Sequence, residues 1–339
     1  TSKADTTQSL SVTLTVVDYT LSYSEDAIML GSATGSGNFT GLASTSYTIN
    51  LTSPQGYPTV RYFSASDASA TWSLDAGTTG ATLASSSGAN TSVSIPVGAT
   101  GTATLTSDAY TIIFDVQANR APSTTLKRGD TFYASGFDWR ILYKASNSDV
   151  LVISEHIIDT QRMHSSYINW DTNIRWDGSA LRAALNNSTY AYSYDNLTDI
   201  KTKILDTTLY TRIGYSDART APYKTGGASD SGHNGYYELT NQKLFLLSEE
   251  EVFRTITYGS DTTDAASLDL TQNLYGSSVV LFADANARRT SGTNSHYWLR
   301  SPRGGTYGAA RVVASTGTVT SIYVNGTFGV RPAFRMNLS

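Results

Sequence analysis

The feature that most constrains this fold is a strict alternation of apolar and polar residues in short runs. In SLSVTLTV (Ser9–Val16), every second residue is Leu or Val. Successive side chains of a strand point to opposite faces, so this run predicts a half-buried strand. Further runs of this kind, separated by turn clusters, are SYTINLT, TVRYFSA, ATWSLD, TSVSIPV, TATLTS and YTIIFDV. Short strands at regular spacing predict a β-sandwich over residues 1–120.

Part of this region also resembles a known class of domain. The stretch ATWSLDAGTTGATLASSSGANTSVSIPVGATGTATLTS, which begins at Ala70, resembles bacterial immunoglobulin-like domains in the cadence of its strands and turns. The chain has no Cys, so the disulfide of antibody-type domains is excluded. The resemblance therefore implies an immunoglobulin-like architecture and a role in holding another domain away from a surface. A binding role of its own is the alternative.

The pattern of apolar and polar residues changes after a polar segment around Pro122. Hydrophobic alternation stops there, so residues 121–130 are predicted to be a linker. The apolar runs TFYASGFDWRILYK and DVLVISEHII then flank the turn Ala145–Asp149 and predict a hairpin. The remainder, residues 131–339, is predicted to be one ligand-binding domain.

Three short helices are predicted after this hairpin. Asp177 precedes GSALRAALN and is expected to accept the free amides of its first turn. TDIKTKIL (Thr198–Leu205) predicts a second helix, and Ser248 three residues before Glu251 predicts a capping box that opens a third. Helices between a hairpin and terminal strands predict an α+β domain.

Six sequence blocks in this region occur in one order: FDWRIL, VLVISEHII, WDGSALRAALN, LFLLSEEEV, YWLRSP and GVRPAF. Together they resemble a domain family of unknown function found in bacterial and phage surface proteins. That family looks like the branch of the C-type lectin fold shared with the formylglycine-generating enzyme. The resemblance covers residues 126–339. It implies that the last strand brings VRPAF (Val330–Phe334) next to FDWRIL (Phe137–Leu142).

The resemblance also implies a function. Proteins of this fold include variable targets of diversity-generating retroelements, in which side chains change on a fixed backbone. Here YWLRSP and GVRPAF border small, polar and aromatic residues that include no obvious acid, base or metal ligand. Exposed aromatic and Arg side chains among small polar ones are typical of a paratope. The predicted ligand-binding residues are Arg303, Thr306, Tyr307, Ser321, Tyr323, Asn325, Thr327 and Phe328.

In SIYVN (Ser321–Asn325), strand alternation places Ser321, Tyr323 and Asn325 on the face opposite Ile322 and Val324. The solvated face of an ordinary edge strand is the competing interpretation. The scaffold is predicted to include Trp298, Arg300 and Arg331, with the arginine charges held by buried hydrogen bonds or carboxylates.

The composition excludes some classes of binding partner and indicates where the protein is located. The net charge is −4, so a nucleic-acid partner is not expected. No apolar run is long enough to span a membrane, so no membrane insertion is expected. Charged residues are only 15% of the chain, and a surface rich in Ser, Thr, Asn, Gly and Tyr fits an extracellular protein of a bacterial cell surface or virion. The expected partner is a protein or glycan ligand on another cell or particle.

No catalytic residue, cofactor or metal is predicted, and the chain is expected not to be an enzyme. The copper-binding cysteines of the formylglycine-generating enzyme are missing. The carboxylates of Glu249, Glu250 and Glu251 fit a helix start better than a glycosidase pair, since successive helical residues point in different directions. His156, His164, His233 and His296 share no metal-binding spacing, and the EPN, QPD and WND motifs of calcium-dependent sugar lectins are absent.

Two alternatives stay open. A carbohydrate-active enzyme would be favoured by an acidic pair in a cleft near Asp261 and Asp264. A structural or adhesion module without a variable face would use the same scaffold with no diversified side chains.

Overall fold

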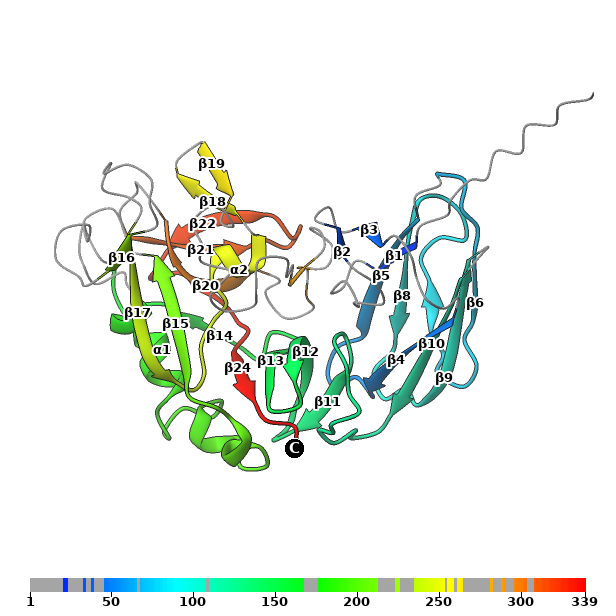
Figure 1. The fold of residues 1–339 in the computed structure, drawn as a ribbon, viewed down its shortest axis with the longest axis horizontal. Helices are drawn as coiled ribbons and strands as arrows, with labels where there is room; N and C mark the ends of the chain where they lie inside the picture. Colours follow the sequence, from blue (N-terminus) through cyan, green and yellow to red (C-terminus); the bar gives the residue numbers. More distant parts are fainter. Residues whose placement is uncertain are drawn as a thin grey trace, which may run out of the picture.

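A computed structural model gives the structure of this chain. It describes residues 21–23, 33–34, 38–39, 46–65, 68–107, 110–167, 176–212, 223–225, 235–253, 255–258, 261–264, 281–282, 288, 290, 296–303 and 308–339. The described part of the chain is mostly β, with few and short helices. The strands form small sheets of two to five strands (Figure 1).

We call the part of the chain before β11 the N-terminal half and the part from β11 onward the C-terminal half, although the second is longer. Two four-stranded sheets make up most of the described N-terminal half. One has the order β1-β5-β8-β7 and the other β4-β10-β9-β6. These strands are β1 (Leu21–Tyr23), β4 (Ser46–Thr52), β5 (Thr59–Ala65), β6 (Trp72–Asp75), β7 (Thr82–Leu83), β8 (Asn90–Ile95), β9 (Gly101–Ser107) and β10 (Tyr110–Gln117). Apolar side chains from both sheets share one buried cluster, with Phe63 and Phe114 in edge-to-face contact at 6.0 Å. A separate small pair is formed by β2 (Ala33–Thr34) and β3 (Asn38–Phe39).

The alternation in the sequence located these strands well. SYTINLT and TVRYFSA coincide with β4 and β5, and the other four described runs overlap β6, β8, β9 and β10. In β4 the burial pattern alternates as expected from Ser46 to Leu51, with Tyr47, Ile49 and Leu51 buried, and ends at Thr52, which is also buried. The run Ser9–Val16 lies outside the described residues.

In the C-terminal half, the described residues form four more sheets around a second hydrophobic cluster. Their orders are β11-β12-β13-β24, β14-β23-β20-β21-β22, β15-β17-β16 and β18-β19. The strands are β11 (Thr131–Ala134), β12 (Phe137–Ser146), β13 (Asp149–Ser154), β14 (Asp159–Arg162), β15 (Thr207–Arg212), β16 (Tyr223–Thr225), β17 (Gly235–Gln242), β18 (Thr255–Tyr258), β19 (Asp261–Asp264), β20 (Tyr297–Pro302), β21 (Ala309–Val313), β22 (Val319–Tyr323), β23 (Thr327–Val330) and β24 (Ala333–Met336).

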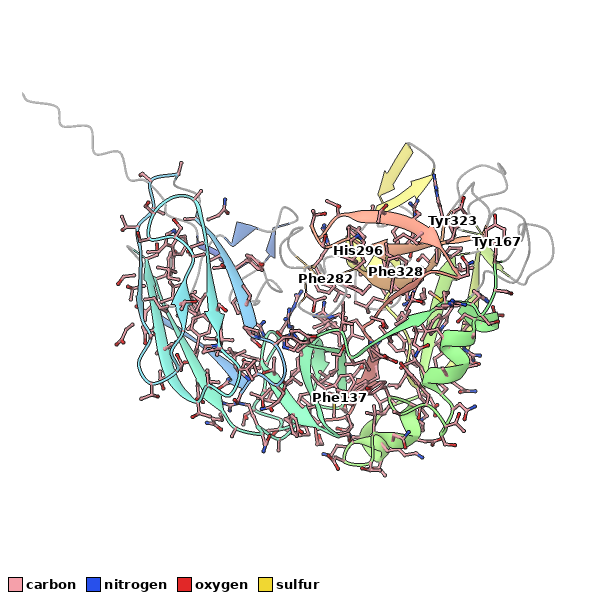
Figure 2. All side chains as sticks on the ribbon, turned by 180° about the vertical axis from the view of Figure 1, so that it is seen from behind. Phe137, Tyr167, Phe282, His296, Tyr323 and Phe328 are labelled. Atoms are coloured by element: carbon pink, nitrogen blue, oxygen red, sulfur yellow. The ribbon has the colours of Figure 1, made fainter. Side chains whose placement is uncertain are left out.

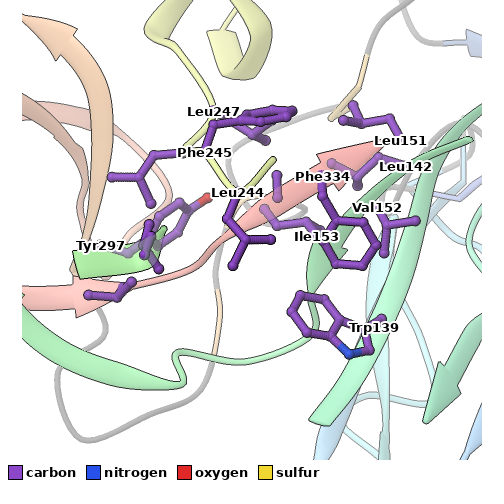
Figure 3. Close-up of a cluster of buried hydrophobic side chains, with 14 of the residues drawn as sticks. Trp139, Leu142, Leu151, Val152, Ile153, Leu244, Phe245, Leu247, Tyr297 and Phe334 are labelled. Carbon is purple, nitrogen blue, oxygen red and sulfur yellow. The ribbon is translucent and has the colours of Figure 1, made fainter. Parts of the chain in front are cut away.

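The predicted hairpin is confirmed, because β12 and β13 pair antiparallel across the turn. The last strand returns to this hairpin, as the resemblance implied. However, β24 pairs with β13, whereas the expected neighbour was FDWRIL in β12. Aromatic packing still connects the two ends of the sequence. The Trp139 ring meets the Phe334 ring edge to face at 4.8 Å in the core (Figure 3).

Helices are few and short in the described part of the chain. They are the 3-10 turns η2 (Trp176–Gly178), η3 (Tyr194–Asn196) and η4 (Lys201–Lys203), and the α-helices α1 (Ala180–Leu185) and α2 (Glu249–Phe253). The N-cap of α1 is Ser179 and not the expected Asp177, because the Ser179 hydroxyl accepts the Arg182 amide. The second predicted helix, over TDIKTKIL, is present only as the 3-10 turn η4, which is shorter than the predicted Thr198–Leu205. None of the described helices is long and apolar enough to cross a membrane.

The predicted fold class, an immunoglobulin-like β-sandwich followed by an α+β C-type lectin fold, is therefore wrong. The finding that overturns it is a mostly β chain whose small sheets are arranged like a propeller. The physical reason lies in helix length: α1 has six residues and α2 has five, so sheets and loops cover the core where helices were expected. The capping box at Ser248 is present, but β18 begins two residues after α2 ends.

The predicted linker is tied to both halves. Leu126 belongs to the C-terminal hydrophobic cluster, and Asp130 is fully buried. Asp130 accepts hydrogen bonds from the backbone and side-chain amides of Asn50 in β4, both at 2.9 Å. The two halves thus meet near β4 and β11, as the lower centre of Figure 1 shows.

Candidate ligand-binding surface

The segment that was predicted to bind a ligand forms β22, a turn and β23. Strand alternation holds in its centre: the Tyr323 side chain is 55% exposed, whereas Val324 is fully buried. Asn325 is half-buried and Thr327 is exposed on the turn and the strand that follow. The backbone of this turn is fixed by hydrogen bonds from Val324 N to Gly308 O and from Gly326 N to Tyr323 O. A rigid turn therefore presents Tyr323 to solvent.

Tyr323 has an aromatic neighbour that the sequence did not indicate. The Tyr167 ring lies edge to face against the Tyr323 ring at 5.4 Å, and Tyr167 is 47% exposed (Figure 2). Among the described residues, the large hydrophobic side chains that are exposed are Val97, Tyr167 and Tyr323. Two of these three are therefore in contact with each other at one place on the C-terminal half. Tyr167 is 156 positions earlier in the chain, so no local pattern could have revealed the pair.

Phe328 does not lie free on this surface, although exposure was expected. It is half-buried and packs against the C-terminal core. Its ring meets the buried Trp298 ring edge to face at 5.3 Å and lies 6.1 Å from His296. A Cβ on Gly326 would come within 2.7 Å of the Phe328 ring, so the turn is also packed on it. Phe328 fastens the turn to the core, and Tyr323 carries the exposed aromatic surface.

The Ser321 side chain also makes a contact within the protein. Its hydroxyl accepts a hydrogen bond of 2.7 Å from Nη1 of Arg311, which is 5% exposed. Arg303 is half-buried just after β20, and its backbone amide donates to Ala309 O at 2.9 Å. Thr306 and Tyr307 lie outside the described residues. The structure thus brings Tyr323, Asn325 and Thr327 together and gives Ser321 and Phe328 internal contacts.

Buried ion pairs connect α2 to strands β20 and β21 of the C-terminal half. Arg300 donates to Glu251 at 2.6 Å, and Arg311 donates to Glu249 at 3.1 Å. Glu250 accepts a hydrogen bond of 3.0 Å from the Ser301 hydroxyl. All three glutamates are at most 3% exposed. Charges buried to this extent are retained only when they are paired, so this network holds α2 against β20 and β21.

The scaffold roles predicted for Trp298, Arg300 and Arg331 are confirmed. Trp298 is fully buried, and its indole N–H donates to Gln161 O at 2.8 Å. Arg331 is 1% exposed and donates to the backbone oxygens of Ser154 and Glu155 at 2.7 and 3.1 Å. These bonds join the segments that border the exposed turn to the core sheets.

The acidic residues weighed for catalysis have other surroundings. Glu251 accepts the Ser248 amide, as the capping interpretation predicted, while the contacts of the three glutamates with Arg300, Ser301 and Arg311 were not predicted. The backbones of Asp261 and Asp264 form the two ends of β19, and their side chains lie outside the described residues. Across the described ranges, no group of three His, Asp or Glu side chains is placed to hold a metal ion. His233 is outside these ranges.

The tyrosine-rich stretch NSTYAYSYDN packs inward. The Tyr190 hydroxyl donates to Asp159 at 2.7 Å, and burial together with this carboxylate raises the pKa of Tyr190. Tyr192 lies edge to face between Tyr190 and Phe137, with ring centroids 5.4 and 5.5 Å away. This packing favours a structural role over sugar stacking for these rings.

Fold and surface together define a mostly β protein with a buried ionic frame and an exposed aromatic turn near its carboxyl end. The chain belongs to the family described as "Domain of unknown function (DUF6273)", whose model matches residues 147–338. This agrees with the predicted family of unknown function, although the matched range begins after FDWRIL. No curated protein matches the sequence.

Two solved structures show a remote likeness to the chain. Domains 4–9 of the surface layer protein SbsC have 10% identity and a TM-score of 0.21, covering 59% of this chain and 26% of that one. Domains 5–6 of the same S-layer protein have 12% identity and a TM-score of 0.20, covering 59% of this chain and 82% of that one. This chain thus spans about a quarter of the first structure. Likenesses at these scores carry no argument about fold or function.

Proposed function

We propose that this chain is a non-catalytic binding protein displayed on a bacterial cell surface or virion. Its ligand would contact the turn between β22 and β23 through the tyrosine pair of Tyr167 and Tyr323. The observation that carries the proposal is the exposure of two large aromatic rings in mutual contact above a buried frame. Tyrosines supply large contact areas at a low entropic cost, and exposed aromatic surface is typical of binding sites.

The surrounding side chains support a recognition role. Asn325 and Thr327 add neutral hydrogen-bonding groups beside Tyr323. Arg300, Arg311 and Arg331 are buried, so their charges belong to the frame. An exposed aromatic centre with an uncharged polar rim suits a protein or glycan ligand better than a phosphate-rich one.

The finer proposal is that these exposed positions vary among copies of the gene, as in targets of diversity-generating retroelements. The support is the contrast between the buried borders at Trp298–Ser301 and Val330–Phe334 and the exposed Tyr323 between them. A near-repeat of the 3′ end of the gene that differs only at adenines would support variation. A genome without such a repeat or a reverse transcriptase gene would contradict it and leave a fixed binding module.

The binding proposal is tested by replacing both tyrosines. Y167A/Y323A is compared with the wild type on a glycan array and on intact bacterial cells. V97A changes the third large hydrophobic side chain that is exposed among the described residues, and it is the matched control. We expect the double variant to lose about tenfold or more of any binding seen with the wild type, because clustered aromatic residues dominate contact energy. Equal losses in V97A, or none in Y167A/Y323A, would place the binding surface elsewhere.

A further inference from the structure

The two halves of the protein meet at a buried ionic contact. Arg61 of β5 is fully buried and donates through Nη1 to Glu155 Oε1 at 2.7 Å. Arg140 of β12 donates through Nε to Glu155 Oε2 at 2.5 Å. One carboxylate thus binds two guanidinium groups, one from each half. Burial alone would raise the pKa of Glu155, but Arg140 and Arg61 hold it well below its usual range.

Further hydrogen bonds extend this contact along β4 and the residues after it. The Thr52 amide donates to the Thr131 hydroxyl at 2.7 Å, next to the bonds between Asn50 and Asp130. The Gln55 amide then donates to Asp138 Oδ2 at 3.2 Å. Asp138 is therefore a side chain of the C-terminal half whose described hydrogen bond comes from the N-terminal half.

The environment of Asp138 is poor for a negative charge. The residue is 6% exposed, and within the described part of the chain Oδ1 has no hydrogen bond of good geometry. The nearby Thr52 side chain lowers the pKa of Asp138, but less than burial raises it. The described ion pairs of Arg61 and Arg140 are made with Glu155. An ionised carboxylate that is buried without its own cation is strongly disfavoured.

The charged group that acts on Asp138 is Glu155, which follows β13 and whose negative charge further raises the pKa of Asp138. Arg61, Arg140 and Arg331 make their described contacts with Glu155. Asp130, which precedes β11, is a second buried acid of this contact, and burial raises its pKa as well. His156 is neutral at physiological pH, since burial lowers its pKa to about 4. Among these influences burial dominates, and it raises the pKa of Asp138 from the ordinary 3.8 to about 7.

We infer that this contact is a pH-responsive joint between the two halves, firm while Asp138 is protonated and weaker once it ionises. An acid whose pKa is raised by folding holds more protons in the closed state than in the open one. The closed state therefore loses stability as pH rises from about 4 to about 7. Glu155 acts in the opposite sense only at acid pH, because its folded pKa is depressed.

The test compares the full-length wild type with D138N. In this variant the Asn oxygen still accepts the Gln55 amide but carries no titratable proton. Hydrogen exchange of the peptide containing Asn50–Tyr57 is measured at pH 5.5 and 8.5 and corrected for intrinsic exchange. We expect the ratio of wild-type to D138N protection to fall about tenfold or more between these pH values. His156 is present in both chains, so the ratio isolates Asp138.

D75N is the matched control, because Asp75 is exposed and an Asn there can still accept the Gly77 amide. A constant ratio for D138N, or an equal change for D75N, would overturn the inference. If D138N does not fold, carboxyl carbon NMR of the wild type decides the question. A titration midpoint of Asp138 near 7 supports the joint, and one near 4 overturns it.

Discussion

At the scale of single residues, neighbouring aromatic side chains in one turn have opposite roles. Tyr323 is exposed, whereas Phe328 packs on Trp298 and the core. We predict that F328A lowers the free energy of unfolding by about 1–3 kcal/mol, below the value for a fully buried Phe because the ring is half-buried. Y323A should change it by less than about 0.5 kcal/mol, as for other surface sites. Urea unfolding of both variants measures this difference, and equal costs would contradict the assignment of the two rings.

The sequence predicted this turn only in part. Alternation placed Tyr323 opposite Val324 correctly, because strand geometry alternates side chains whatever they contact. It could not predict that Phe328 would pack inward or that Tyr167 would meet Tyr323. Those facts depend on which strands become neighbours, and β23 lies between β14 and β20 through pairings distant in the sequence.

At the scale of elements, the start of α2 combines a cap with a buried charge pair. The Ser248 amide donates to Glu251, and the Glu251 amide donates to the Ser248 hydroxyl. Glu251 also binds Arg300 at 2.6 Å. S248A removes half of the capping box, which costs about 1 kcal/mol. E251Q preserves the box, since Gln suits that position, but it removes the negative charge that faces the buried Arg300, which costs about 3–5 kcal/mol.

Chemical denaturation should therefore rank E251Q as more damaging than S248A. The reverse order would mean that the helix cap, and not the buried pair, holds α2 in place. The capping box was visible in the sequence because its residues are three positions apart. The arginine partners were not, since Arg300 and Arg311 lie 49 and 62 positions from the carboxylates they bind. The same distance dependence explains why short strands were located well while the assembled fold class was wrong.

At the scale of the whole molecule, the residues that the family model matches are packed against strands and cations that lie outside the matched range. Residues 147–338 include β13 and Glu155 but omit β11 and β12, which pair beside β13. They also omit Arg140 and Arg61, the two cations bound to Glu155. A buried carboxylate without cations is strongly destabilising. Of the two cations, only Arg61 belongs to the N-terminal half, so that half stabilises the C-terminal one by supplying a cation to its buried carboxylate.

This coupling predicts the outcome of removing Arg61. In R61M a flexible apolar side chain replaces the guanidinium, and Glu155 keeps only its described pair with Arg140. We expect a loss of about 1–3 kcal/mol, less than for a fully orphaned charge. Calorimetry should show one unfolding transition for the wild type and two for R61M, because the halves no longer stabilise each other through this pair. K201M removes the exposed pair with Asp195 and should leave a single transition at an unchanged midpoint. If R61M behaves like K201M, the two halves are energetically independent, and the buried pair merely accompanies their contact.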